Sequence, residues 1–216
     1  MKRLFLLLLL LGFTTFSFGT GSTIEQIFLQ IPMVYFRAFE ENGVGQLNAQ
    51  VRKQLLTTYK SGQLILFLID PKSGYLHLGT ESDGWSMQAT ITYWRFGNST
   101  LVGLTIDKED GCSNKSEEVY FFEYANGKLV DISQRFKPDL SLKRFDITDT
   151  KVLQSFDGMK HTIWRLPQIG KVITIKPFYY VCGGDGFEGS PVYYEIEPTS
   201  MNAYRLVKKY GKNVNK

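Results

Sequence analysis

Residues 179–196 have the composition of several kinds of functional loop. The stretch YYVCGGDGFEGSPVYYEI places Cys182 and the carboxylates of Asp185 and Glu188 among four glycines. A phosphate-binding loop needs glycines that lead into a helix N-terminus, and a nucleophile elbow needs the pattern G-x-S-x-G. Here the glycines lead into a Ser-Pro pair and another aromatic run. We therefore interpret the stretch as the long loop of a hairpin, with Asp185 and Glu188 as candidate binding residues.

The chain has two cysteines, Cys112 and Cys182. An even number of cysteines in an exported protein indicates a disulfide, because the compartment is oxidising. Such a bond would close a loop of about 70 residues and contribute about 4 kcal/mol in the chain-entropy description. We predict a Cys112–Cys182 disulfide; the alternative is two unpaired buried thiols.

A disulfide would also bring carboxylates together. Cys112 lies in the acidic segment 107–118, DKEDGCSNKSEE, and the bond would place this segment near Asp185 and Glu188. Several carboxylate oxygens in one place could hold calcium. Solvated loop tips explain the same residues, so we expect no metal site and no cofactor.

Signatures of catalysis are sparse. The two histidines, His77 and His161, fall within strand patterns and not at the spacing of zinc ligands. We interpret both as buried or edge-strand histidines. The sequence contains no nucleotide-binding fingerprint. Carboxylates that pair in space, as in glycoside hydrolases, stay open as an alternative, because their spacing in the sequence does not reveal them.

The chain is rich in aromatic residues, with 16 Phe, 12 Tyr and 3 Trp. Tyrosine doublets at 179–180 and 193–194 place one ring on each face of a strand. Tyr180, Tyr193 and Trp94 are therefore candidates for an accessible aromatic sheet face that binds sugars, peptides or apolar ligands. Helices that cover this face, or rings that pair across strands, are the alternative. At Trp94 the apolar alternation changes parity, which indicates a bulge or a strand buried on both sides.

The N-terminal part of the chain predicts two helices. Ser22 and Glu25 match a capping box, and apolar residues follow at helical spacing until Pro32. A second helix is predicted over residues 46–60, with Gly62 as its left-handed C-terminal cap. Both apolar stripes indicate packing against a core.

From residue 63 onward the apolar residues alternate, which predicts about eight to ten strands joined by short turns. Asn126 and Gly127 form the strongest hairpin signal. No helical crossover separates the strands, so the sheet should be antiparallel and largely a meander. The predicted fold class is α+β, an N-terminal helical pair packed on a large curved antiparallel sheet that is open or closed like a barrel.

The first 19 residues predict a secretory signal peptide. Lys2 and Arg3 precede an apolar run at 4–13, and small residues at Ser17 and Gly19 fit a cleavage site after Gly19. An uncleaved anchor is the alternative, but the run is about ten residues long and a bilayer requires about 20. The expected location is therefore periplasmic or extracellular.

Residues 20–216 are predicted to form a single α+β domain. Removal of two basic residues with the leader leaves 23 of the 25 Lys and Arg against 21 Asp and Glu. This balance, about +2, is not that of a nucleic-acid-binding protein, so we expect no nucleic-acid partner. No later segment is apolar and long enough to predict a membrane span.

Several segments resemble small secreted proteins of uncharacterised function from Bacteroidales and their relatives. They are IEQIFLQIP, DGWSMQATI, LVGLTI and EVYFFEYANGKLVDI, all within residues 23–136. The resemblance implies a bacterial cell-envelope context and no particular activity.

Together these features predict a non-enzymatic binding or interaction domain whose partner is an envelope protein, a glycan or a lipid. The alternatives are a secreted hydrolase with paired carboxylates and a lipocalin-like carrier of a small apolar ligand. An open sheet with exposed Tyr180 or Tyr193 would favour the interaction domain, whereas a closed barrel would favour the carrier.

Overall fold

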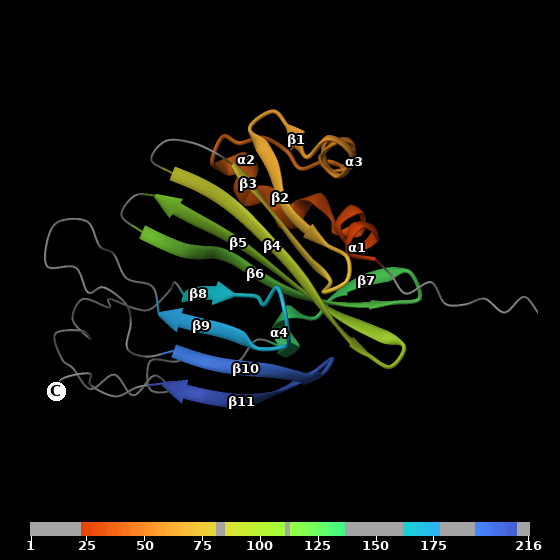
Figure 1. Cartoon of the computed structure of the whole chain (residues 1–216), viewed down its shortest axis with the longest axis vertical. Helices are drawn as coiled ribbons and strands as arrows, with labels where there is room; N and C mark the ends of the chain where they lie inside the picture. Colours follow the sequence, from red (N-terminus) through yellow and green to blue (C-terminus); the bar gives the residue numbers. More distant parts are fainter. Residues whose placement is uncertain (1–22, 81–84, 111–112, 137–161, 178–192, 211–216) are drawn as a thin grey trace, which may run out of the picture.

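The protein consists of two antiparallel sheets and a small group of helices. The computed structural model describes residues 23–80, 85–110, 113–136, 162–177 and 193–210. In Figure 1 the N-terminal helices lie on one side of a long seven-stranded sheet, and a four-stranded sheet lies on the other side. The predicted α+β class is confirmed in this coarse form.

Helix α1 (Ile24–Gln30) begins with a capping box one residue later than predicted. The Thr23 hydroxyl accepts from the Gln26 backbone N–H at 3.3 Å, and the Gln26 side chain accepts from the Thr23 N–H at 3.1 Å. Two short elements that the sequence did not predict follow Pro32. They are η1 (Met33–Phe36) and α2 (Arg37–Glu41).

Helix α3 (Ala49–Thr58) is shorter than the predicted second helix and ends differently. Asn48 caps its start, because the Asn48 Oδ1 accepts from two backbone N–H groups at 3.0 Å. Its left-handed C-terminal residue is Tyr59, with φ of 61°. The prediction that Gly62 caps this helix is wrong. Gly62 instead supplies a positive φ of 59° in the turn after Lys60 and Ser61.

Arg52 joins the two main helices and is 4% exposed. Its Nη1 donates to the carbonyl oxygens of Phe28 and Ile31, both at 2.6 Å. The last carbonyls of α1 have no partner inside the helix, so this guanidinium satisfies them. Helix α3 thereby fixes the C-terminal end of α1.

The seven-stranded sheet is a meander in which each strand pairs with the next. Its strands are β1 (Lys60–Ser61), β2 (Leu64–Asp70), β3 (Tyr75–Thr80), β4 (Trp85–Phe96), β5 (Ser99–Asp110), β6 (Ser113–Ala125) and β7 (Lys128–Asp131). The hairpin predicted at Asn126 and Gly127 is confirmed: both residues have positive φ, 51° and 74°, between the paired Ala125 and Lys128. Within the described residues β1 and β7 form the two edges, so the sheet is open and not closed into a barrel.

The remaining strands form a separate four-stranded sheet, whereas the sequence predicted one large sheet. They are β8 (Thr162–Arg165), β9 (Ile173–Pro177), β10 (Tyr193–Ser200) and β11 (Ala203–Tyr210), in the order β11-β10-β9-β8. Helix α4 (Ser133–Phe136) follows β7 and packs on β6. Its Phe136 is fully buried, with its ring centroid 4.3 Å from that of Phe121.

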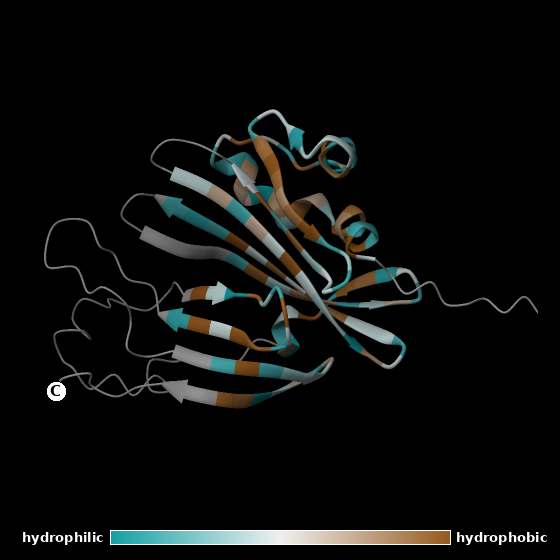
Figure 2. Ribbon diagram, in the orientation of Figure 1, coloured by the Kyte–Doolittle hydropathy of each residue, from teal (hydrophilic) through white to brown (hydrophobic). Residues whose placement is uncertain are grey.

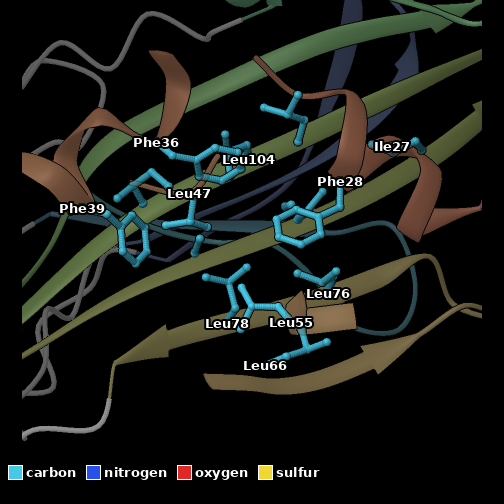
Figure 3. Close-up of a cluster of buried hydrophobic side chains, with 14 of the residues drawn as sticks. Ile27, Phe28, Phe36, Phe39, Leu47, Leu55, Leu66, Leu76, Leu78 and Leu104 are labelled. Atoms are coloured by element: carbon cyan, nitrogen blue, oxygen red, sulfur yellow. The ribbon is translucent and has the colours of Figure 1, made fainter. Parts of the chain in front are cut away.

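Two apolar clusters hold the layers together. In the first, the helix side chains of Phe28 and Phe36, together with Leu47 from the segment before α3, point toward strand residues such as Leu76 and Leu104 (Figure 3). The second cluster lies between the two sheets and contains Trp94, Leu101, Val119, Phe121, Ile132, Phe136, Trp164, Leu166, Ile173, Ile175 and Ile196. Figure 2 shows β2 as almost continuously hydrophobic, whereas β4 has alternating bands. In the part of the chain that the structure describes, no helix has the length and apolar character needed to cross a membrane.

Candidate ligand-binding face

Trp94, one of the predicted binding residues, is buried between the two sheets. It is 3% exposed, and its ring lies over Gly103, where a Cβ would come within 3.2 Å of Trp94 Cζ3. Ile91, on the opposite side of β4, packs in the helix-side cluster, and the β4–β5 register has no shift. Strand β4 is therefore buried on both sides at this point and has no bulge. The Trp94 ring is not accessible to a ligand.

The other predicted candidates fall mostly beyond the described residues. Tyr180, Cys182, Asp185 and Glu188 all lie in the segment 178–192, and Cys112 lies in the gap at 111–112, outside the described residues. The disulfide between the cysteines thus stays a prediction, which peptide mapping under non-reducing conditions tests directly.

Tyr193 is the first residue of β10, where its backbone pairs with that of Tyr210. Its partner strand β11 forms an edge of the four-stranded sheet within the described residues. Tyr193 therefore belongs to the second sheet, and the predicted candidates Trp94 and Tyr193 lie on different sheets.

The structure shows a different aromatic face, on strands β2 to β5 of the seven-stranded sheet. Leu68 pairs with His77, His77 with Thr90, and Thr90 with Thr105, so these four side chains form one row. Residues that pair directly across antiparallel strands point to the same side. This row lies on the face opposite the helices. We call the part of this face beyond the second sheet the open half. It consists of Phe67, Leu68, Tyr75, His77, Gln88, Thr90 and Asp107, with Arg165 from β8 at its border. Thr90 and Asp107 are themselves buried in it.

A bulge in β2 places two apolar side chains on the open half. The β2–β3 register shifts between Leu66 and Leu68, so Phe67 is an extra residue. Its ring stacks on the imidazole of His77, with centroids 5.5 Å apart and an interplanar angle of 30°. Phe67 is 45% exposed and Leu68 is 38% exposed. A bulge re-aims side chains in this way at sheet edges and near binding sites.

The absence of a side chain at Gly79 leaves room for the Phe67 ring. A Cβ at position 79 would lie 3.0 Å from Phe67 Cε2 and 2.6 Å from the Met87 carbonyl oxygen. The second contact involves backbone and cannot relax through a side chain. Glycine is therefore required here, because it lets β3 pass beneath the aromatic ring.

His77 is held as a neutral imidazole. Its Nδ1 lies 3.1 Å from the Thr90 hydroxyl oxygen. Burial lowers the pKa of His77, and the positive charge of Arg165 lowers it further. Burial raises the pKa of the neighbouring Tyr75 hydroxyl. Both side chains are uncharged at neutral pH, and each can donate or accept a hydrogen bond.

Asp107 and Arg165 connect the open half to the second sheet. Asp107 is 5% exposed, and its Oδ2 lies 3.6 Å from Arg165 Nη1. The Thr105 hydroxyl donates to the same Oδ2 at 3.3 Å. The Arg165 side chain is 46% exposed, so it covers the buried carboxylate and also faces solvent. A second polar contact joins the first sheet to the segment after β8: the Thr92 hydroxyl donates to the Pro167 carbonyl at 3.2 Å.

The open half combines exposed aromatic and aliphatic surface with a few polar groups. Ligand-binding sites commonly have this composition. Asp107 is the one Asp or Glu residue among the described residues whose side chain is buried as a whole. The described residues also contain no group of three or more His, Cys, Asp or Glu side chains that could hold a metal ion.

Local sequence patterns point only weakly to these residues. The run LILFLI is continuously apolar, so it hides the bulge at Phe67. The sequence predicts a buried or edge-strand position for His77. The side chain is half-buried on β3, the third strand in an order that begins at the edge strand β1, and this position fits neither description fully. Asp107 and Arg165 are far apart in the chain, so no local pattern links them.

No protein-family model, curated protein or solved structure matches this chain. The expected relationship to secreted Bacteroidales proteins therefore stays a prediction, and the site is judged on its own geometry.

Proposed function

We propose that the protein is an exported, non-enzymatic binding domain of the bacterial cell envelope and that it binds its partner on the open half. The observation that carries this proposal is the exposed pair Phe67 and Leu68 beside the half-buried Tyr75 and His77. Two large apolar side chains next to convergent polar groups favour a recognition surface, since a purely structural sheet face would cover them.

Binding is favoured over hydrolysis by the contacts of the buried Asp107 carboxylate. A glycoside hydrolase needs a second carboxyl group about 5–9 Å away. The described partners of Asp107 are instead the guanidinium of Arg165 and the hydroxyl of Thr105. These contacts hold Asp107 in a fixed place, where it positions the Arg165 side chain.

The lipocalin-like carrier is not supported. A carrier of that class needs a closed barrel around an apolar cavity. The sheet is open in the described residues, and Thr90 and Asp107 line the face opposite the helices with polar groups.

Co-purification from native cell envelopes tests the proposal, with mass spectrometry for proteins, glycans and lipids. We expect the wild-type chain to retain a specific partner and Phe67→Ser to lose it. Val130→Ser is the matched control, because Val130 is 54% exposed on β7 at the other edge of the sheet. Equal retention by both variants, or turnover of glycoside or ester substrates by the purified chain, would contradict the proposal.

Export is tested separately. We expect intact-mass measurement of the mature protein to show that it starts at Thr20. Retention of residues 1–19 would contradict cleavage of the leader and favour an anchored protein.

A further inference from the structure

We infer that the ligand of the open half is a neutral oligosaccharide that stacks on Phe67 and hydrogen-bonds to Arg165. This inference rests on the proposed binding function and specifies its ligand class. It follows from the shape of the aromatic platform, from the charge of the face and from the groups that reach solvent.

The aromatic platform fits the apolar face of a sugar ring. The Phe67 and His77 rings lie nearly parallel, and the Phe67 ring is the more exposed of the two. The face of an aromatic ring carries partial negative charge. The axial C–H groups on one side of a pyranose carry partial positive charge, so the two surfaces attract each other. The His77 ring supports Phe67 from behind and limits its rotation.

The charges on this face select an uncharged ligand. The positive charge of Arg165 is balanced by Asp107. The exposed Glu109 follows two residues after Asp107 on the same side of β5. Asp70, at the other end of the face, accepts from the backbone N–H groups of Lys72 and Ser73. Uronic or sialic acids would meet the carboxylates of Glu109 and Asp70 here, and like charges repel.

The face carries both hydrogen-bond donors and hydrogen-bond acceptors. Arg165 donates only, whereas Tyr75 and the amide of Gln88 can donate and accept. Sugar hydroxyls also do both, so they can satisfy each of these groups. Asp107 is buried and serves as a positioning residue, because its carboxylate fixes the guanidinium that contacts the ligand.

The extent of the face indicates several sugar units. Phe67 on β2 and Asp107 on β5 are separated by three strand spacings, or about 14 Å. This length exceeds a single pyranose ring. A peptide that binds by strand addition would instead need free backbone groups at a sheet edge. A lipid chain could not satisfy the hydrogen-bonding groups of Gln88 and Tyr75 that their protein partners Ser86 and Thr90 leave free, and burying such groups costs free energy.

NMR or calorimetric titration of the exported chain tests the inference. The probes are neutral hexasaccharides of glucose, mannose and xylose, a uronic-acid hexasaccharide, unstructured peptides and phosphatidylglycerol vesicles. We expect a neutral hexasaccharide to bind and to shift the resonances of Phe67 and His77. Phe67→Ala and Arg165→Met should each weaken binding about tenfold or more, and Val130→Ala should leave it unchanged. Asp107→Asn should also weaken binding although Arg165 is still present, because the guanidinium is no longer held in place. At temperatures far below unfolding the variant is folded, so a loss of stability alone would leave its affinity unchanged.

The outcomes separate the ligand class from the binding function. Binding of the uronate, the peptides or the vesicles through Phe67, without binding of neutral sugars, would overturn the saccharide and leave the binding domain in place. If none of the probes binds, and Phe67→Ser has no effect on envelope association, both proposals are wrong.

Discussion

The face of the seven-stranded sheet that points away from the helices has two halves with different surroundings. The covered half, which consists of Trp94, Leu101, Val119 and Phe121, packs under the second sheet and is almost fully buried. The open half begins where that sheet ends, at the Asp107–Arg165 pair. Apolar side chains in the covered half stabilise the fold, whereas those in the open half contact solvent. The same strands β4 and β5 contribute to both halves.

Burial on this face depends on which strands the second sheet reaches. Leu101 on β5 and Leu68 on β2 lie on the same face, but Leu101 is fully buried and Leu68 is 38% exposed. Leu101 packs in the apolar cluster between the sheets, where β8 contacts β5 and β6. The second sheet therefore decides which apolar side chains of this face stabilise the interior and which contact solvent.

The largest effect should come from the covered half. Phe121→Ala should lower the free energy of unfolding by about 4 kcal/mol, because it removes a fully buried ring that contacts Phe136 and Trp164. Phe67→Ala should cost less than about 1 kcal/mol, since that ring is 45% exposed. Urea denaturation of both variants measures the contrast. Equal losses would show that the open half contributes to stability as the covered half does.

A smaller effect is expected at the border between the halves. Asp107→Asn should cost about 1.5 kcal/mol, because it removes the charge that pairs with Arg165 at nearly constant volume. The loss is limited because the half-exposed guanidinium can be solvated. Glu109→Gln is the matched control, as Glu109 is an exposed carboxylate on the same strand. An equal loss of stability in Glu109→Gln would show that the effect at Asp107 does not come from its ion pair with Arg165.

The hydrogen bond between Thr92 and Pro167 should contribute about 1 kcal/mol to the free energy of unfolding. Thr92→Val retains the shape of a side chain that is 2% exposed and removes the hydroxyl that donates to the Pro167 carbonyl. Thermal unfolding monitored by circular dichroism measures the loss. A variant as stable as the wild type would show that water replaces this hydrogen bond.

The smallest effect is a pH dependence that originates in the open half. The pKa of His77 is lowered in the folded protein by burial and by Arg165, so below its unfolded value of 6.5 the unfolded chain binds more protons. The free energy of unfolding should therefore fall as pH decreases from 6.5 toward the folded pKa of His77. His77→Gln should flatten this part of the profile in urea denaturation. An unchanged slope would assign the pH dependence to other groups.

Local signals in the sequence predicted the elements better than their assembly. The hairpin at Asn126 and Gly127 and the first helix were accessible from neighbouring residues, because turns and caps are short-range effects. The parity change at Trp94 left two alternatives, a bulge or burial on both sides, and the structure shows the second. The division of the strands into two sheets was not, since it depends on contacts between distant segments. β8 meets β5 and β6 rather than extending the first sheet.

The candidate site was less predictable than the fold for the same physical reason. An aromatic sheet face was expected, but Trp94 is inside the molecule and the exposed ring is Phe67. Alternation alone could not distinguish them, because exposure depends on where the second sheet ends. The ion pair of Asp107 and Arg165 depends on a contact between two sheets, which residue spacing does not encode.

The buried Arg52 has a consequence for the order in which the N-terminal region folds. A helix of seven residues such as α1 is unstable in isolation. Its terminal carbonyls at Phe28 and Ile31 gain their partner only when α3 supplies the guanidinium. The two helices should therefore form and open as one cooperative unit, although 18 residues separate their ends in the chain. In native-state hydrogen exchange, the backbone amides of Ile31 and Leu55 should then report the same opening free energy.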